Sequence, residues 1–295
     1  MQTISITITN EEDGRRVRGI LRGVLGFSAH AVSSLTRTET GIQVNGQRAY
    51  APTVVHAGDV LQVEIGDRTS ENSGILPGNW PLPIVYEDDY LLAADKPSGM
   101  VAMASSFHPE TPTVAGALAF QKGTAAVFHV VNRLDKGTTG LMIVAKSGYV
   151  HNLLRRQLHT PDFSREYRGI CLGRPDPENG TIDLPIGRDE TSTVARKIRA
   201  DGARAVTHYE VLETRGPFSL LRLVPETGRT HQLRVHLAAI GHPLAGDWLY
   251  GTEDPDRIAR PALHSCALRL RHPVTGETLR LSSPLPEDMR RLMEF

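Results

Sequence analysis

Residues 128–145 read FHVVNRLDKGTTGLMIVA, which is two apolar runs separated by a charged loop. Apolar runs of this length, bounded by turn residues, predict two buried strands. Between them, Arg133, Asp135 and Lys136 place three charges within four residues. A single Asp in a loop is ordinarily a turn or cap residue, but three charges crowded beside two core strands favour a functional site. The segment therefore predicts a buried part of a sheet with a candidate site next to it.

Two further segments carry unusual charges. Residues 226–236 read ETGRTHQLRVH, with Thr230 placed to cap a helix. In a plain capped helix, Arg229 and Arg234 would lie at the positive end of the helix dipole, where cations are disfavoured. A local rule broken without a visible gain indicates function. The segment Arg165-Glu166-Tyr167-Arg168 opens a predicted strand, where Tyr is ordinarily a half-buried core residue.

The region over 84–295 alternates strand-like and helix-like stretches. Its strands often follow one another without an intervening helix, which favours an α+β fold with a mixed, mainly antiparallel sheet. Besides the two strands around the charged loop, the predicted segments are strands at 84–86, 90–94, 165–172, 206–212 and 220–224, a helix capped by Ser147, and a helix from Thr230 to Gly241.

The first 67 residues read as a separate small unit. Apolar residues over 17–25 recur at helical spacing, and Ser28 is placed to cap a second short helix that Gly41 ends. Asn45-Gly46 between two extended stretches predicts a hairpin, because both turn positions need positive φ. The predicted division is a small α/β unit over 1–67, a linker rich in Gly, Pro, Ser and Asn over 68–83, and a larger domain over 84–295.

Charge is balanced overall but not locally. Lys plus Arg and Asp plus Glu each number 33, which excludes indiscriminate polyanion binding by net charge. Binding is a property of patches, however. Residues 15–48 hold six arginines and one acid, and residues 121–174 hold nine basic residues and three acids. In the first unit, this makes an RNA-binding module as good an interpretation as an ordinary solvated helix face.

Several classes of protein lack their signatures here. No apolar run approaches the roughly 18 residues that span a bilayer. Cys171 and Cys266 are the only cysteines, which argues against a disulfide framework and for a cytoplasmic protein. There is no P-loop, dinucleotide-binding or nucleophile-elbow motif. His231 and His236 are five residues apart, a spacing that suits chelation on neither a helix nor a strand, so we expect no metal site.

Four blocks of residues together carry a family resemblance. They are Glu87-Asp88-x-Tyr90-Leu91-Leu92-x-x-Asp95-Lys96-Pro97-Ser98-Gly99-Met100, then Arg133-Leu134-Asp135-x-x-Thr138-x-Gly140, then Arg165-Glu166-Tyr167, and last Gly228-Arg229-Thr230-His231-Gln232-Leu233-Arg234-Val235-His236 with Gly241-His242-Pro243-Leu244-x-Gly246-Asp247 and Tyr250. In this order they resemble the RluA-type family of RNA pseudouridine synthases, over residues 84–283. Residues 1–67 are similar, more weakly, to the small RNA-binding module of the ribosomal-protein type that often precedes this catalytic domain.

The resemblance implies an isomerase that converts uridine to pseudouridine in structured RNA, without cofactor or metal, on the α+β fold of pseudouridine synthases. It implies that Asp135 is the catalytic aspartate, that Arg234 is its ion-pair partner and that Tyr167 packs on the base. Arg133 is expected to hold the target nucleotide out of the stack. Further RNA contacts are expected from Lys96, Lys136, Arg229, His231, Gln232, Arg15, Arg16 and Arg37.

Two residues depart from the family pattern, and two other classes of protein are alternatives to the synthase. Asn132 and Thr139 stand where the family usually has His and Ser, which leaves the RNA target open. We expect a monomeric enzyme that acts on ribosomal RNA first and transfer RNA second. A non-catalytic RNA-binding or ribosome-assembly factor is the alternative that the intact catalytic set disfavours. A glycoside hydrolase would need a second catalytic carboxylate beside Asp135. The acids available are Glu87, Asp88 and Asp95.

Overall fold

The computed structural model describes residues 2–67, 75–103, 111–123, 127–158 and 160–294. The predicted linker at 68–83 therefore lies partly outside the described residues. The first unit forms a four-stranded sheet in the order β1-β4-β2-β3 with short helices beside it. Its elements are β1 (Thr3–Thr7), η1 (Asn10–Glu12), α1 (Val17–Gly19), the π-helical turn η2 (Ile20–Val24), α2 (Ala29–Thr36), β2 (Ile42–Val44), β3 (Gln47–Arg48) and β4 (Val60–Glu64).

Local sequence signals account for most of this unit. The Ser28 hydroxyl accepts the Ala31 N–H at the start of α2, as predicted. Asn45 and Gly46 both have positive φ, at 52° and 78°, and turn β2 into β3. The prediction that Gly41 ends α2 is wrong, because the helix ends at Thr36. Gly41 serves a different purpose: a Cβ there would lie 2.3 Å from the Leu35 carbonyl oxygen, so only glycine lets the chain pass.

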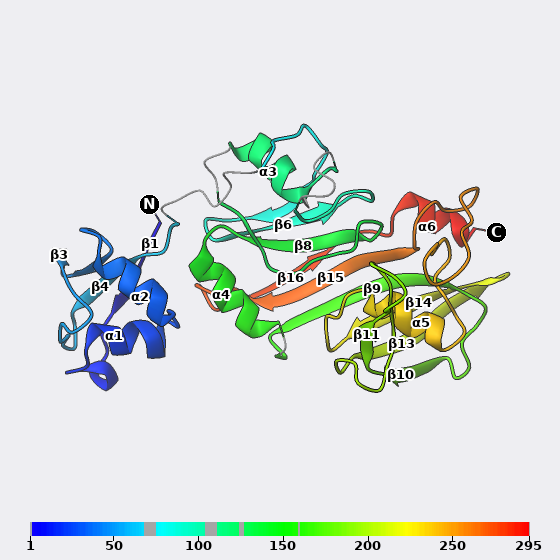
Figure 1. Cartoon of the computed structure of the whole chain (residues 1–295). Helices are drawn as coiled ribbons and strands as arrows, with labels where there is room; N and C mark the ends of the chain where they lie inside the picture. Colours follow the sequence, from blue (N-terminus) through cyan, green and yellow to red (C-terminus); the bar gives the residue numbers. More distant parts are fainter. Residues whose placement is uncertain (1, 68–74, 104–110, 124–126, 159, 295) are drawn as a thin grey trace.

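The larger sheet has ten strands and confirms the predicted α+β class. Its order is β10-β13-β14-β9-β15-β8-β6-β5, with β16 beside β15 and β7 beside β8 (Figure 1). Every pair is antiparallel except β15 with β8. The elements of this part of the chain are β5 (Ile84–Glu87), β6 (Leu91–Lys96), α3 (Val114–Lys122), β7 (His129–Val130), β8 (Thr139–Ala145), α4 (Gly148–Gln157), β9 (Phe163–Leu172), β10 (Asn179–Asp183), β11 (Ile186–Arg188), β12 (Arg196–Ile198), β13 (Val206–Arg215), β14 (Phe218–Pro225), α5 (Gln232–Ala239), β15 (Leu263–Arg271), β16 (Thr278–Ser282) and α6 (Glu287–Leu292). Strands β11 and β12 form a separate two-stranded sheet.

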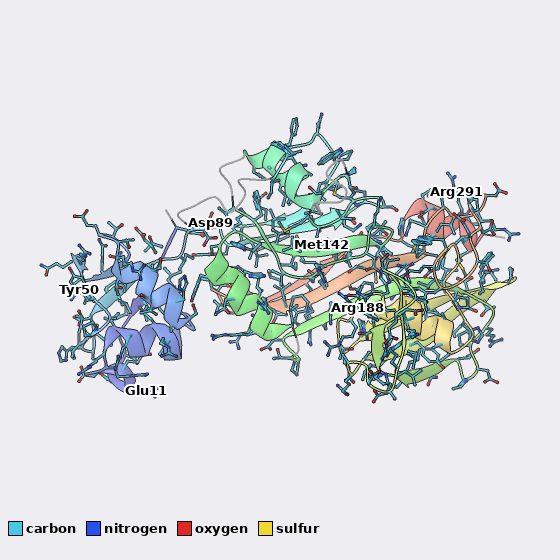
Figure 2. The ribbon with its side chains drawn as sticks, in the orientation of Figure 1. Glu11, Tyr50, Asp89, Met142, Arg188 and Arg291 are labelled. Carbon is cyan, nitrogen blue, oxygen red and sulfur yellow. The ribbon has the colours of Figure 1, made fainter. Side chains whose placement is uncertain are left out.

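The apolar run of β8 is buried on both faces of the sheet. Met142 and Val144 belong to a cluster that includes α3, whereas Leu141 and Ile143 belong to a cluster that includes α4. Alternate residues of a strand point to opposite faces, so a continuous apolar run suits a strand covered on both sides. Met142 accordingly lies in the middle of the molecule (Figure 2). In the described part of the chain, no helix combines the length and apolar character that crossing a membrane requires.

The N-terminal unit packs against α4 (Figure 1). The Tyr149 hydroxyl donates to the Leu25 carbonyl oxygen at 2.8 Å, and its ring stacks on Phe27 with centroids 4.2 Å apart. The Asn152 amide donates to the Gly26 carbonyl oxygen at 3.3 Å. Buried residues of both sheets join one apolar cluster, so the two parts share a core.

Candidate active site

Asp135 lies in the loop between β7 and β8, as predicted from the sequence. The loop is fixed at its end by Gly140, whose φ is 106° and whose Cβ, if present, would lie 2.3 Å from the Ser265 carbonyl oxygen. Glycine therefore lets β15 approach β8 in parallel directly below the loop. The Asp135 side chain is 27% exposed, so it is reachable from solvent yet surrounded by protein.

Arg234 is brought to Asp135 from the first turns of α5. Its Nη1 lies 3.5 Å from Asp135 Oδ2, so the structure brings the two predicted partners together. The shorter bonds go elsewhere: Nε and Nη2 donate to the two carboxylate oxygens of Asp247 at 2.8 and 2.7 Å. Burial works to lower the pKa of Arg234, but the bonds to Asp247 outweigh it and raise the pKa. The buried Asp247 thus offsets the cost of a cation at the start of a helix.

Asp247 and Tyr250 are site residues whose roles were not predicted from the sequence. Both belong to the fourth block of the resemblance, which was the available signal. Asp247 is fully buried, and its Oδ1 also accepts the N–H groups of Leu249 and Tyr250. The Tyr250 ring lies 5.1 Å below the Arg234 guanidinium. Together these two residues fix the orientation of Arg234.

His231 connects Tyr250 to Asp135. The Tyr250 hydroxyl oxygen accepts the Arg196 N–H at 2.8 Å and lies 2.8 Å from His231 Nδ1. Burial lowers the pKa of His231, so the ring is neutral near pH 7. In the tautomer with the ring proton on Nε2, the hydroxyl donates its hydrogen to Nδ1, and Nε2 lies 3.9 Å from Asp135 Oδ2. In this tautomer His231 directs an N–H toward Asp135, at a separation longer than a hydrogen bond.

His231 also corrects the predicted start of α5. Thr230 is not the cap: the cap position is His231, with φ at 57° and no side-chain bond to the helix. Gln232 instead binds the loop that precedes the helix, because its Oε1 accepts the Arg229 N–H at 3.0 Å and the Thr227 hydroxyl at 2.7 Å. Its Nε2 donates to the Val206 carbonyl and the Thr207 hydroxyl. Gln232 lines the cleft, but its amide groups are bonded to protein groups, so the structure places it as a support of the loop, and its contact with RNA stays a prediction.

Lys96 is also placed differently from the prediction. It is fully buried, and its Nζ donates to the carbonyl oxygens of Pro97, Met100 and Lys136 at 2.9, 2.8 and 3.2 Å. All three ammonium donors are used, and none faces solvent, which corrects the prediction that Lys96 binds RNA. Because Lys136 follows Asp135, Lys96 instead ties the candidate catalytic loop to the end of β6.

Tyr167 lies on β9 and lines the same cleft as Asp135. It is buried, and it pairs in register with Ser265 on the neighbouring strand β15. Burial raises the pKa of its phenol above the ordinary value of about 10, so the group is neutral near pH 7. A neutral, immobile ring suits stacking on a flat base, whereas it is a poor proton acceptor.

The cleft around Asp135 is strongly basic. Its volume is about 1430 Å³, beyond the roughly 300–1000 Å³ of small-molecule pockets. Among its described lining residues, Asp135 is the one acid, and seven are basic: Arg133, Lys136, Arg165, Arg196, Arg229, Arg234 and Arg260. The acids Glu87, Asp88 and Asp95 are not among this lining, which removes the support for a glycosidase pair. The cleft therefore suits an extended polyanion.

The predicted RNA contacts divide between two places. Arg133, Lys136 and Arg229 are exposed and line the cleft. Arg15, Arg16 and Arg37 are exposed on the N-terminal unit and are not part of that lining. Within the described ranges, no three His, Cys, Asp or Glu side chains gather closely enough to hold a metal ion.

Asn132 and Thr139, the two departures from the family pattern, are buried structural residues here. Asn132 Oδ1 accepts the Ile143 N–H at 2.7 Å, which ties the loop to β8. Thr139 Oγ1 lies 2.9 Å from His264 Nδ1 of β15. Neither side chain lies free at the surface, so both act on the shape of the loop.

Comparison with known proteins identifies the class. A sequence profile of the family described as RNA pseudouridylate synthase matches residues 90–239. An uncharacterized RNA pseudouridine synthase of Bacillus subtilis, YjbO, is 36% identical over 274 residues, which cover 92% of this chain and 96% of the relative. Ribosomal large subunit pseudouridine synthase D of Nitrosomonas europaea is 36% identical over 307 residues, which cover 99% of this chain and 87% of the relative.

A solved structure agrees with the sequence relatives. Human RNA Pseudouridylate Synthase Domain Containing 1 is similar with a TM-score of 0.58 at 28% identity, covering 69% of this chain and 83% of that chain. The chain belongs to the RNA pseudouridylate synthase family, in its RluA-type branch. It is thus an RNA pseudouridine synthase, an isomerase that converts uridine to pseudouridine in RNA, and the predicted resemblance is confirmed.

Proposed function

We propose that the enzyme modifies ribosomal RNA, by turning a uridine out of the RNA stack and isomerising it with Asp135 as the reacting carboxylate. One observation carries the proposal: Asp135 is the single acid among the described lining residues of a basic cleft, and Arg234 lies 3.5 Å from it. The ribosomal target rests on the relatives named ribosomal large subunit pseudouridine synthase D.

The reaction needs an ionised carboxylate. The C1′–N1 bond breaks, the uracil turns, a C1′–C5 bond forms, and the C5 hydrogen is lost while N1 gains a proton. Asp135 either attacks the sugar or removes a sugar proton, and both routes start from its charged form. Arg234 stabilises that form, and its bonds to Asp247 keep the guanidinium in place without reorganisation during the reaction.

Tyr167 and Arg133 have separate tasks in this proposal. A base in structured RNA must leave its stack, which costs a few kcal/mol. The buried, neutral Tyr167 ring offers the uracil a stacking surface beside Asp135. The exposed Arg133 supports the distorted RNA backbone from the edge of the loop. Phosphate contacts from Lys136 and Arg229 position the strand.

Residues 1–67 are proposed to add RNA affinity outside the cleft. Arg15, Arg16 and Arg37 are all exposed on this unit, and contacts of this kind position an RNA without reading its sequence. The unit's contacts with α4 hold that basic surface in a fixed place relative to the cleft.

The test is tritium release from uridine labelled at C5, with bulk ribosomal and transfer RNA from a strain lacking the enzyme. Wild type is expected to release tritium from ribosomal RNA, and Asp135→Asn to release none. Asp162→Asn, at an exposed position outside the cleft, serves as the matched control and keeps activity. Release from transfer RNA alone overturns the ribosomal target. Full activity of a folded Asp135→Asn overturns the role of Asp135.

A further inference from the structure

We propose that Trp248 is a stacking platform for a nucleobase next to the target uridine, an inference that rests on the proposed function. The chain has two tryptophans. Trp80 packs against the core. Trp248 is 58% exposed and lines the same cleft as Asp135. No sequence motif predicted a role for it.

The backbone that carries Trp248 is held by hydrogen bonds, which distinguishes Trp248 from an ordinary exposed apolar residue. Single exposed apolar side chains are common and need no explanation. Trp248, however, directly follows Asp247, whose buried carboxylate accepts the N–H groups of Leu249 and Tyr250 and binds Arg234. The backbone on both sides of the indole is therefore fixed by the carboxylate that fixes Arg234. A side chain presented from a fixed backbone loses little entropy on binding.

The composition of the cleft that Trp248 lines indicates the ligand. The cleft carries Arg196 and Arg229, whose charges suit phosphates, while the indole offers a flat face of the size of a base. Basic grooves with aromatic side chains are how proteins hold single-stranded nucleic acid. Met103 and Val194 also line the cleft with exposed apolar groups, but aliphatic side chains have no π face.

The base proposed to stack on Trp248 is a neighbour of the target uridine, because the target uracil itself is proposed to bind at Tyr167 and Asp135. Tyr167 is buried and lines the cleft with Asp135, so the reacting base belongs there. Trp248 is mostly exposed, so a base stacked on it would keep its other face toward solvent. Trp248 therefore contributes to RNA affinity and register without touching the reacting atoms.

The first experiment replaces Trp248 by Ala, Leu and Phe and measures tritium release from unmodified large-subunit ribosomal RNA. Stacking predicts a KM about 5- to 150-fold higher for Ala and Leu, with kcat changed less than about twofold, and recovery of KM with Phe. A KM for Leu equal to that of Phe overturns stacking. Phe120→Leu, at an exposed aromatic outside the cleft lining, is the matched control and should keep the wild-type KM.

A second measurement is independent of catalysis. In a Trp80→Phe, Asp135→Asn protein, Trp248 is the only tryptophan, so tryptophan fluorescence reports on it alone. The Asp135→Asn change is expected to let the same RNA bind without being converted. Quenching of its emission on titration supports the proposal, and unchanged emission at saturating RNA overturns it. If wild type converts no RNA, the proposed function fails, while the quenching result still decides whether Trp248 contacts RNA.

Discussion

Arg234 donates two short hydrogen bonds to the buried Asp247, and this pair aims the remaining Nη1 of Arg234 at Asp135, 3.5 Å away. The acid that holds the arginine is thus a different residue from the acid that is proposed to react. This division keeps Asp135 free to approach the sugar, since its partner needs no rearrangement to stay in place. It also makes the site depend on a residue that never touches the RNA.

Asp247→Ala is therefore expected to lower both stability and activity. The change leaves a buried guanidinium without its acid, a loss of about 3–5 kcal/mol in the free energy of unfolding. Urea denaturation measures this loss, and tritium release measures the fall in kcat. Asp254→Ala removes a partly exposed acid from a surface pair with Arg257 and should cost less than about 1 kcal/mol. Equal losses in the two variants would show that Asp247 holds nothing in place.

The sequence predicted the centre of the site but not what supports it. Asp135, Tyr167 and Arg234 lie in blocks with a strong family pattern, and the structure brings them to one cleft. Lys96 and Gln232 lie in the same blocks, yet both are buried and bonded to backbone groups. A motif gives the type of a residue and its neighbours in the chain, but its burial depends on strands that are distant in sequence.

Other supports have no local signal at all. Arg260 donates to both carboxylate oxygens of Asp288 on α6, at 2.7 and 2.8 Å, and to the Gly137 carbonyl at 3.4 Å. The C-terminal helix thus reaches the candidate catalytic loop through one buried arginine.

Helix α3 was also not predicted, because its residues are apolar on most sides and show no helical stripe.

The neutral form of His231 leads to a prediction about side-chain shape. Glutamine at position 231 places an amide N–H near the position of Nε2, and asparagine places it near Nδ1. We expect His231→Gln to keep activity within about threefold and His231→Asn to lose roughly tenfold, which corresponds to about 1.4 kcal/mol of stabilisation of the Asp135 carboxylate by an N–H directed toward it. The φ of 57° favours Asn, so backbone strain is no explanation for its loss. Tritium release at saturating RNA measures the activity of both variants. A higher activity of His231→Asn than of His231→Gln would place the ring proton on Nδ1.

Burial of Lys96 predicts a rise of stability with pH. Burial lowers the pKa of Lys96 to about 7, whereas the unfolded value is about 10.4. Below pH 7 the amine is protonated in both states, so it adds no slope. Between these values the unfolded chain binds one more proton, so stability increases by up to about 1.4 kcal/mol per pH unit.

Lys96→Met isolates that effect, because all other titrating groups are shared with wild type. The difference in unfolding free energy, wild type minus variant, should grow by about 2 kcal/mol from pH 7 to 8.5 in urea titrations. A constant difference would mean that the three carbonyl groups keep the ammonium charged throughout. The same variant frees the Lys136 carbonyl, so its activity should fall at every pH.

Two glycines with the same backbone conformation test the contact between the N-terminal unit and α4. Gly26 and Gly46 have φ of 75° and 78°, so alanine costs about 1–2 kcal/mol of backbone strain at either position. A Cβ at Gly46 meets nothing within 4 Å, whereas at Gly26 it would lie 3.1 Å from Leu153 Cδ2 and 2.8 Å from Arg156 Nη1. Gly26→Ala should therefore lose about 1 kcal/mol more than Gly46→Ala. Gly26→Ala should also speed proteolytic release of residues 1–67, and equal stability with equal cleavage would show that this contact does not hold the unit.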